Sequence, residues 1–305
     1  MSIQLRETIL ECLAEAQSDL NEKKQKSLQT LATITKVSPQ NRNLLAQTNG
    51  AIPALLQLSK SSFPNIHILA LSILFNLSLN PNIKRSLADM DIIFYLNSVI
   101  LSPSSTEISK LAASLLCSLA MLDKNKAKFG VAGTIQVLVK AISRPKNPAA
   151  HHLLSTLAEL VLFHGNCTVA VQSGAVPVLV QVVESTEGED LAGTSLTILG
   201  LLARFDEGLT ALRKTDEIVR KMLEVLKGRS MLSKEGAAEI LLRLFDDSEG
   251  YLRDALMLPE FSSVLADISV RGSGKAREKA GLLMKKLMEA SFNSTTDGVS
   301  GFLQW

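Results

Sequence analysis

The chain has 305 residues, 46% of them hydrophobic and 4% aromatic, and its 32 basic and 30 acidic residues give a net charge of +2. The hydrophobic content excludes a disordered chain, and the balanced charge argues against nucleic acid as a partner. The three cysteines form no CxxC pair, which argues against a disulfide framework and a structural zinc site, so we expect no metal and no cofactor.

The N-terminal segment, residues 1–22, is predicted to be a capping helix. Charged residues interrupt it from Arg6 onward, so it lacks the apolar core of a signal peptide. The longest apolar run, residues 66–79, has about 14 residues and contains Asn76, which makes it too short to cross a bilayer. We therefore expect no membrane span and a cytoplasmic or nuclear location.

After a first apolar helix at residues 27–34, one short phrase recurs along the chain. It consists of a turn residue, a small residue, a branched apolar residue, often a proline, and an aliphatic run. Residues 50–56 (GAIPALL) and 174–180 (GAVPVLV) are nearly identical copies. The copies follow one another at intervals of 40 to 43 residues, a period typical of two- and three-helix repeat proteins. They begin at Gly50, Met90, Gly133, Gly174, Glu217 and Pro259.

Each copy of the phrase predicts the end of one helix and the start of the next. Glycine suits a left-handed helix end, and proline suits the first turn of a helix. A longer apolar helix follows each phrase, as at residues 68–77 and 110–119, and a short polar helix precedes the next phrase, as at residues 82–88. The sequence therefore predicts an all-α fold of about six three-helix repeats with end caps. These occupy residues 23–290, and a flexible tail follows at residues 291–305.

The three-helix unit and the Gly-x-Ile-Pro opening of its second helix resemble armadillo repeats over residues 23–290. Within that family, residues 74–84 (LFNLSLNPNIK) and 119–130 (LAMLDKNKAKFG) look like plant U-box/armadillo proteins. The resemblance implies a right-handed α-α superhelix, the armadillo solenoid, which binds partner proteins in a concave groove. The U-box itself is a separate module before the repeats, and we expect it to be missing because only residues 1–22 precede them.

In this family the third helix of each repeat lines the groove, and importin-type members place Trp and Asn there to hold basic peptides. Asn76 matches this Asn. The equivalent positions of other repeats hold Ser118, Glu159, Arg243 and Lys286. We expect these five residues to contact a protein or peptide partner. The two late cations further predict that the C-terminal half binds an acidic segment.

The favoured function is a non-catalytic protein–protein interaction scaffold or adaptor. No Walker loop, dinucleotide fingerprint or Gly-x-Ser-x-Gly motif is found, so no catalytic residue is expected. One alternative is the substrate-recognition subunit of an E3 ubiquitin ligase that acts with a U-box or another catalytic partner. A third, an importin-like carrier, is disfavoured because the single Trp, Trp305, lies in the predicted tail and not on a third helix.

Overall fold

The computed structural model describes residues 2–185 and 188–300, with side chains described for residues 3–185 and 188–292. Every regular element in these residues is a helix, and they form twenty helices. The prediction of an all-α fold is therefore confirmed. The chain divides into two compact units, unit 1 up to Asn166 and unit 2 from Cys167, and each is described by itself.

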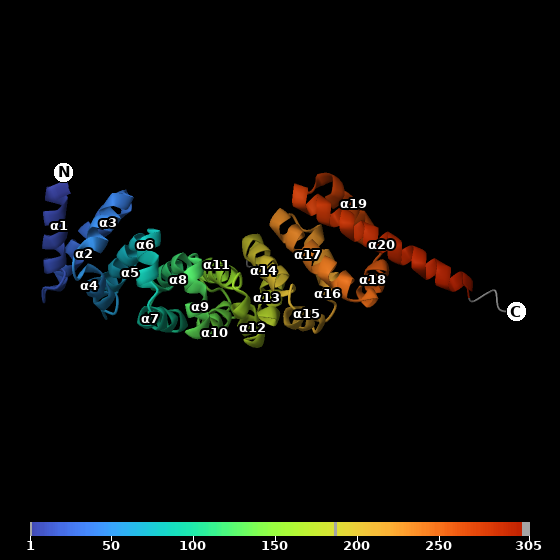
Figure 1. Cartoon of the computed structure of the whole chain (residues 1–305), viewed down its shortest axis with the longest axis horizontal. Helices are drawn as coiled ribbons and strands as arrows, with labels where there is room; N and C mark the ends of the chain where they lie inside the picture. Colours follow the sequence, from blue (N-terminus) through green and yellow to red (C-terminus); the bar gives the residue numbers. More distant parts are fainter. Residues whose placement is uncertain (1, 186–187, 301–305) are drawn as a thin grey trace. The chain divides into compact units, whose positions relative to one another are not determined.

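Unit 1 begins with two helices and continues with repeats of three helices (Figure 1). The leading helices are α1 (Ser2–Glu15) and α2 (Asn21–Val37). The repeats comprise α3 (Pro39–Gln47), α4 (Ala51–Leu58) and α5 (Pro64–Ser78); α6 (Pro81–Leu87), α7 (Met90–Leu101) and α8 (Thr106–Ala120); and α9 (Asp123–Val131), α10 (Thr134–Ile142) and α11 (Ala150–Leu160).

Unit 2 is built from the same three-helix repeat. Its first helix, α12 (His164–Gln172), contains the boundary between the units. The other helices are α13 (Ala175–Glu184) and α14 (Glu189–Leu202); α15 (Asp206–Arg213), α16 (Ile218–Lys227) and α17 (Met231–Asp247); and α18 (Glu249–Leu256), α19 (Phe261–Arg271) and α20 (Gly274–Ser300). In the described residues, the two units together hold the predicted six repeats and the leading half-repeat.

The recurring phrase acts at the start of the second helix of a repeat, as predicted. Gly50, Gly133 and Gly174 have φ values of 77°, 73° and 80° and directly precede α4, α10 and α13. A side chain is strained in this left-handed conformation, whereas glycine adopts it freely. Glu217 occupies the same position before α16 with φ 53°, so the turn is kept there without glycine.

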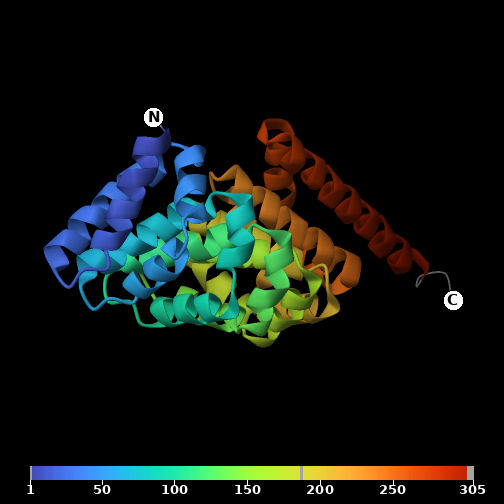
Figure 2. The ribbon, with the colours of Figure 1, turned by 60° about the vertical axis from the view of Figure 1, so that its left-hand side comes forward.

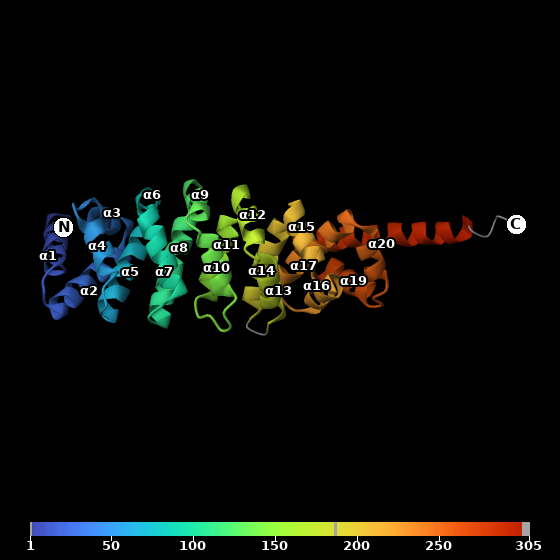
Figure 3. The same ribbon diagram turned by 90° about the horizontal axis from the view of Figure 1, so that it is seen from below.

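The third helix of each repeat packs on the third helices of neighbouring repeats. In unit 1 these are α2, α5, α8 and α11, and in unit 2 they are α14, α17 and α20. Figure 3 shows the first helices α3, α6 and α9 along one edge of unit 1. The third helices are buried on several sides, and in α5 the side chains of Ile73, Leu74 and Leu77 are fully buried. Burial of each such side chain contributes about 1.5–3 kcal/mol.

Two predicted boundaries differ from the structure. The predicted cap at residues 1–22 holds α1 and also the start of α2, which begins at Asn21. At the other end α20 continues to Ser300 (Figure 2), so residues 291–300 belong to a helix and not to a separate tail. Each residue added to an existing helix gains one hydrogen bond, which allows a polar run to extend it. Residues 301–305, with Trp305, lie outside the described residues.

In the described part of the chain, no single helix combines the length and the apolar character needed to cross a membrane. Helices α12 and α13 reach that length and composition only together, and they are bent by 77° relative to each other.

Candidate partner-binding surfaces

The third helices of unit 1 each present a hydroxyl at the same position of the repeat. The hydroxyls of Thr30 and Ser114 donate to carbonyls four residues earlier in their own helices, at 3.1 and 2.7 Å, which leaves their oxygens able to accept from a bound molecule. These side chains are half-buried or exposed. We call the four residues the hydroxyl row: Thr30, Ser72, Ser114 and Ser155.

An apolar row runs along the ends of the same four helices. Its members recur at intervals of 42, 42 and 41 residues, and they are 73%, 46%, 58% and 57% exposed. Large apolar side chains that are exposed at one position of four successive repeats are a candidate site of interaction with another molecule. We call these four residues the apolar row: Val37, Leu79, Met121 and Leu162.

Basic side chains accompany the apolar row at one position of the first helices. Arg42, Lys84 and Lys126 occupy α3, α6 and α9 at intervals of 42 residues. Nη1 of Arg42 donates to the carbonyl of Thr35, at 3.4 Å, which places the guanidinium near the end of α2. Val37 follows Thr35 by two residues. Its Nε is buried and has no hydrogen-bond partner among the described residues.

Lys84 lies beside the end of α8. The side-chain amide of Asn125 donates both to the Lys84 carbonyl, at 3.3 Å, and to the Leu119 carbonyl, at 2.9 Å. The two bonds hold this turn of α6 against the end of α8, where Met121 follows. Burial lowers the pKa of Lys84, and the electrostatic effects of Cys117 and Glu159 oppose that shift only in part.

Lys126 is only 4% exposed and forms two ion pairs. Its Nζ lies 2.8 Å from Oδ1 of Asp123 and 3.3 Å from Oε2 of Glu159. Burial by itself would lower the pKa of Lys126, but the hydrogen bonds to both carboxylates outweigh it and raise the pKa. Glu159, which we predicted to contact a partner, is half-buried and neutralises this lysine at the edge of the third-helix surface.

Two predicted partner-binding side chains are instead bonded between third helices. Asn76 is 6% exposed, and its Nδ2 donates to Oγ1 of Thr35 at 3.0 Å. Ser118 is also 6% exposed, and its hydroxyl donates to the carbonyl of Ser78 at 3.2 Å. These positions face the neighbouring third helix, because adjacent helices pack closely there. Both side chains are therefore parts of the repeat interface, which corrects their assignment to the exposed surface.

In unit 2 the two predicted cations lie against carboxylates of α17. Nη2 of Arg243 lies 3.1 Å from Oε1 of Glu239, which also pairs with Lys279 of α20. Lys286 pairs with Asp246. Since both cations are neutralised within the chain, their positions do not support an acidic guest at these residues.

The two units differ in charge and in how the charges are paired. Unit 1 has 16 basic and 10 acidic residues, a net charge of +6, whereas unit 2 has 16 basic and 20 acidic residues, a net charge of −4. In the described part of unit 1, Lys126 forms ion pairs with Asp123 and Glu159. The ion pairs of unit 2 are far more numerous and include bonds between successive third helices. Unit 1 therefore carries an excess of positive charge, whereas unit 2 is rich in ion pairs.

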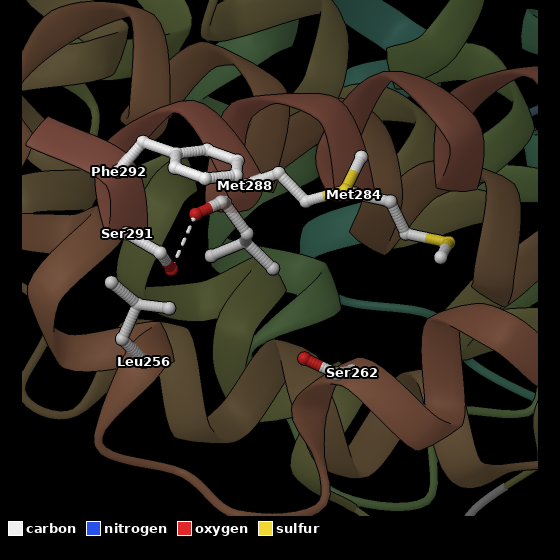
Figure 4. A pocket seen from close by; sticks show the side chains of 7 residues that line it. Leu256, Ser262, Met284, Met288, Ser291 and Phe292 are labelled. Carbon is white, nitrogen blue, oxygen red and sulfur yellow. Dashed lines mark hydrogen bonds between the residues drawn. The ribbon is translucent and has the colours of Figure 1, made fainter.

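An apolar cavity of about 480 Å³ lies at α18, α19 and α20 in unit 2. Figure 4 shows Met284, Met288 and Phe292 of α20 pointing toward it, with Leu256 on the opposite wall. The hydroxyl of Ser291 donates to the Leu287 carbonyl at 2.9 Å and so stays within its own helix. The lining offers apolar contact surface, and none of its side chains titrates.

The described residues hold no group of three or more His, Cys, Asp and Glu side chains placed to bind a metal ion.

A family model, the plant U-box protein ARM repeat region, matches residues 6–299. The chain belongs to this family. The resemblance to the plant U-box/armadillo group is therefore confirmed. The chain is 30% identical over 217 residues to U-box domain-containing protein 8 of Arabidopsis thaliana. That match covers 71% of this chain and 56% of the relative, so the chain spans little more than half of that protein.

Solved armadillo structures confirm the fold. An engineered protein aligns with a TM-score of 0.78 and 17% identity, over 93% of this chain and 72% of its own. A designed armadillo repeat protein, solved in complex with the peptide (KR)4, aligns with a TM-score of 0.68 and 16% identity, over 76% of this chain and 98% of its own. At this level of identity the comparison bears on the armadillo fold alone.

The prediction from sequence missed the apolar row of unit 1. The Asn and Trp of importin-type members occupy two positions of the third helix, and the Trp position is that of the hydroxyl row at Ser72, Ser114 and Ser155. The signal was present at a third position, because Val37, Leu79, Met121 and Leu162 recur with the period of the repeat. Only their exposure separates them from the many buried aliphatic residues at other positions.

Proposed function

We propose that this chain is a non-catalytic scaffold that holds segments of partner proteins against its third helices. The observation that carries the proposal is the apolar row, which exposes a large apolar side chain at the same position of four successive third helices. A partner that covers this row removes apolar surface from water, and the hydroxyl row, about two turns earlier on the same helices, offers hydrogen bonds to its backbone.

A bound peptide in a designed armadillo repeat protein supports the same class of ligand. That peptide, (KR)4, is strongly basic. Unit 1 of this chain has a net charge of +6, which disfavours a basic guest there. The same charge argues against the importin-like carrier. So do the hydroxyl side chains of Ser72 and Ser114, which occupy the third-helix position where importin-type members place Trp.

The proposal is tested by placing bulky side chains at two positions of the hydroxyl row. Ser72→Trp with Ser114→Trp adds bulk to the surface of α5 and α8, and the matched control, Ser98→Trp with Ser143→Trp, adds the same bulk to exposed positions at the second helices α7 and α10. Affinity capture from plant extract, quantified by mass spectrometry, should show partners lost with the first variant and kept with the second. An identical set of partners with both variants would reject the third helices as the binding surface.

A second candidate function is the recognition of substrates for a ubiquitin ligase. The specific observation that favours it is the match to U-box domain-containing protein 8 over 56% of that relative. In a reconstituted reaction with ubiquitin, its activating and conjugating enzymes and a U-box protein, a captured partner should be ubiquitinated faster when this chain is added. An unchanged rate would reject this role. In either role we propose a cytoplasmic or nuclear location.

A further inference from the structure

We propose that the edge of unit 1 formed by the apolar row and the first-helix cations binds an acidic peptide segment that carries apolar side chains at regular intervals. Carboxylates of this segment bind Arg42 and Lys84, and its apolar side chains cover Leu79 and Met121. The inference rests on the proposed function and adds to it the place, the charge and the spacing of the guest.

The spacing follows from the distance between neighbouring helices. Packed helices lie about 8–10 Å apart, so the members of the apolar row follow one another at that interval. An extended polyproline-type chain returns to the same side every third residue, about 9.3 Å along its axis. A guest of about ten residues with an apolar side chain at every third position therefore matches the row from Val37 to Leu162.

The charge of the guest follows from the two cations. Arg42 and Lys84 are half-buried, yet neither forms an ion pair with a described carboxylate, and the Nε of Arg42 has no hydrogen-bond partner there. Lys126, at the same position of the next repeat, has two carboxylates. Arg42 and Lys84 thus form no ion pair like those of Lys126, and Glu159, whose charge also acts on Lys84, is bonded to Lys126.

The two features are adjacent. The guanidinium of Arg42 bonds the carbonyl of Thr35, two residues before Val37, and the Asn125 amide joins the backbone carbonyl of Lys84 to that of Leu119, two residues before Met121. The Arg42 guanidinium and the Lys84 backbone therefore each lie beside the end of a third helix that carries a member of the apolar row. A guest can satisfy both at once, and the net charge of +6 on unit 1 favours its approach.

The test is a selection of displayed random peptides of about 15 residues on the full chain, long enough to span the four helices. Enriched peptides should be acidic and should carry apolar residues near every third position. Their affinities are then measured by fluorescence anisotropy. Arg42→Gln with Lys84→Gln should weaken binding by about tenfold or more, which corresponds to about 1.4 kcal/mol, and higher salt should weaken the wild-type complex.

The matched control is Lys60→Gln with Lys140→Gln, which removes the same charge from exposed positions at the second helices, where we expect a change within about twofold. Leu79→Ser with Met121→Ser should weaken binding without altering the salt dependence. Enriched peptides with no acidic excess, or acidic peptides insensitive to Arg42→Gln with Lys84→Gln, would overturn the inference and leave the scaffold proposal standing. Failure to enrich any peptide would overturn the inference, whereas the scaffold proposal is decided by the affinity capture with the tryptophan variants.

Discussion

The side-chain amide of Asn76 donates a hydrogen bond of 3.0 Å to the hydroxyl of Thr35 and so joins α5 to α2 across one repeat. Thr35 in turn donates to carbonyls of its own helix at Leu31 and Ala32. A polar side chain that the sequence places on a binding surface thus serves the contact between two third helices. A substitution at Asn76 should therefore change the stability of the fold and not the affinity for a partner.

Asn76→Ala is expected to lower the free energy of unfolding by about 1–3 kcal/mol, because it leaves the buried Thr35 hydroxyl without its cross-helix partner and opens a small void. Partner binding should change little when measured well below the melting temperature. Thermal unfolding followed by circular dichroism gives the first quantity. Ser72→Ala, one turn earlier on the exposed side of α5, serves as the control and should leave the melting temperature nearly unchanged.

Replacement of glycine by alanine should have opposite effects on the free energy of unfolding at two positions of unit 2. Gly174→Ala forces a side chain into the left-handed conformation at φ 80°, and we expect a loss of about 1 kcal/mol even though nothing lies within 4 Å of the added carbon. Gly281→Ala, in an exposed turn of α20 that is equally open, should gain about 0.5–1 kcal/mol from helix propensity. Urea unfolding measures the change in the free energy of unfolding for each variant. If both variants were stabilised, the turn before α13 would not require its glycine.

Glu159→Gln should destabilise unit 1 by about 1–2 kcal/mol, because it leaves the buried ammonium of Lys126 with Asp123 as its only carboxylate. The raised pKa of Lys126 means that its contribution to stability is complete below about 10.5, the ordinary lysine pKa, and is lost as pH rises through the folded-state pKa. Between neutral and strongly alkaline pH, denaturant unfolding should show a smaller loss of unfolding free energy for the variant than for the wild type. The same pH dependence in both proteins would contradict the role of Glu159 in raising the pKa of Lys126.

In unit 2 the carboxyl of Glu239 should give stability that is lost in acid. Burial by itself would raise its pKa, but the hydrogen bonds and charges of Lys279 and Arg243 outweigh burial and lower it. A carboxyl with a lowered folded-state pKa stabilises the fold above its unfolded pKa, about 4.5, and this contribution disappears as pH falls through the folded value.

Glu239→Gln should therefore be less stable than the wild type at neutral pH, and the difference should shrink below about pH 4.5. Chemical unfolding of the two proteins over an acid series measures this, with the exposed Glu249→Gln as a control for general loss of charge. A difference that grows in acid would mean that the ion pairs of α17 and α20 do not set the pKa of Glu239.

The sequence by itself determined the repeat. Gly50, Gly133 and Gly174 mark helix ends because the left-handed turn excludes most other residues, and the aliphatic runs that follow must be buried. These are local requirements, so they appear in the sequence with the period of the structure. The resemblance to the plant U-box/armadillo group rested on the same periodic residues, and the family comparison confirmed it.

Only the tertiary structure decided which polar and apolar side chains face outward. Asn76 and Ser118 are bonded to neighbouring third helices, and Arg243 and Lys286 are paired with carboxylates of α17. Met121 and Leu119 are both large apolar residues and lie two positions apart, yet Met121 is 58% exposed and Leu119 is fully buried. Periodicity tells that a position is equivalent from repeat to repeat. Its exposure depends on how closely the next helix approaches, which is set by contacts between residues about 40 positions apart.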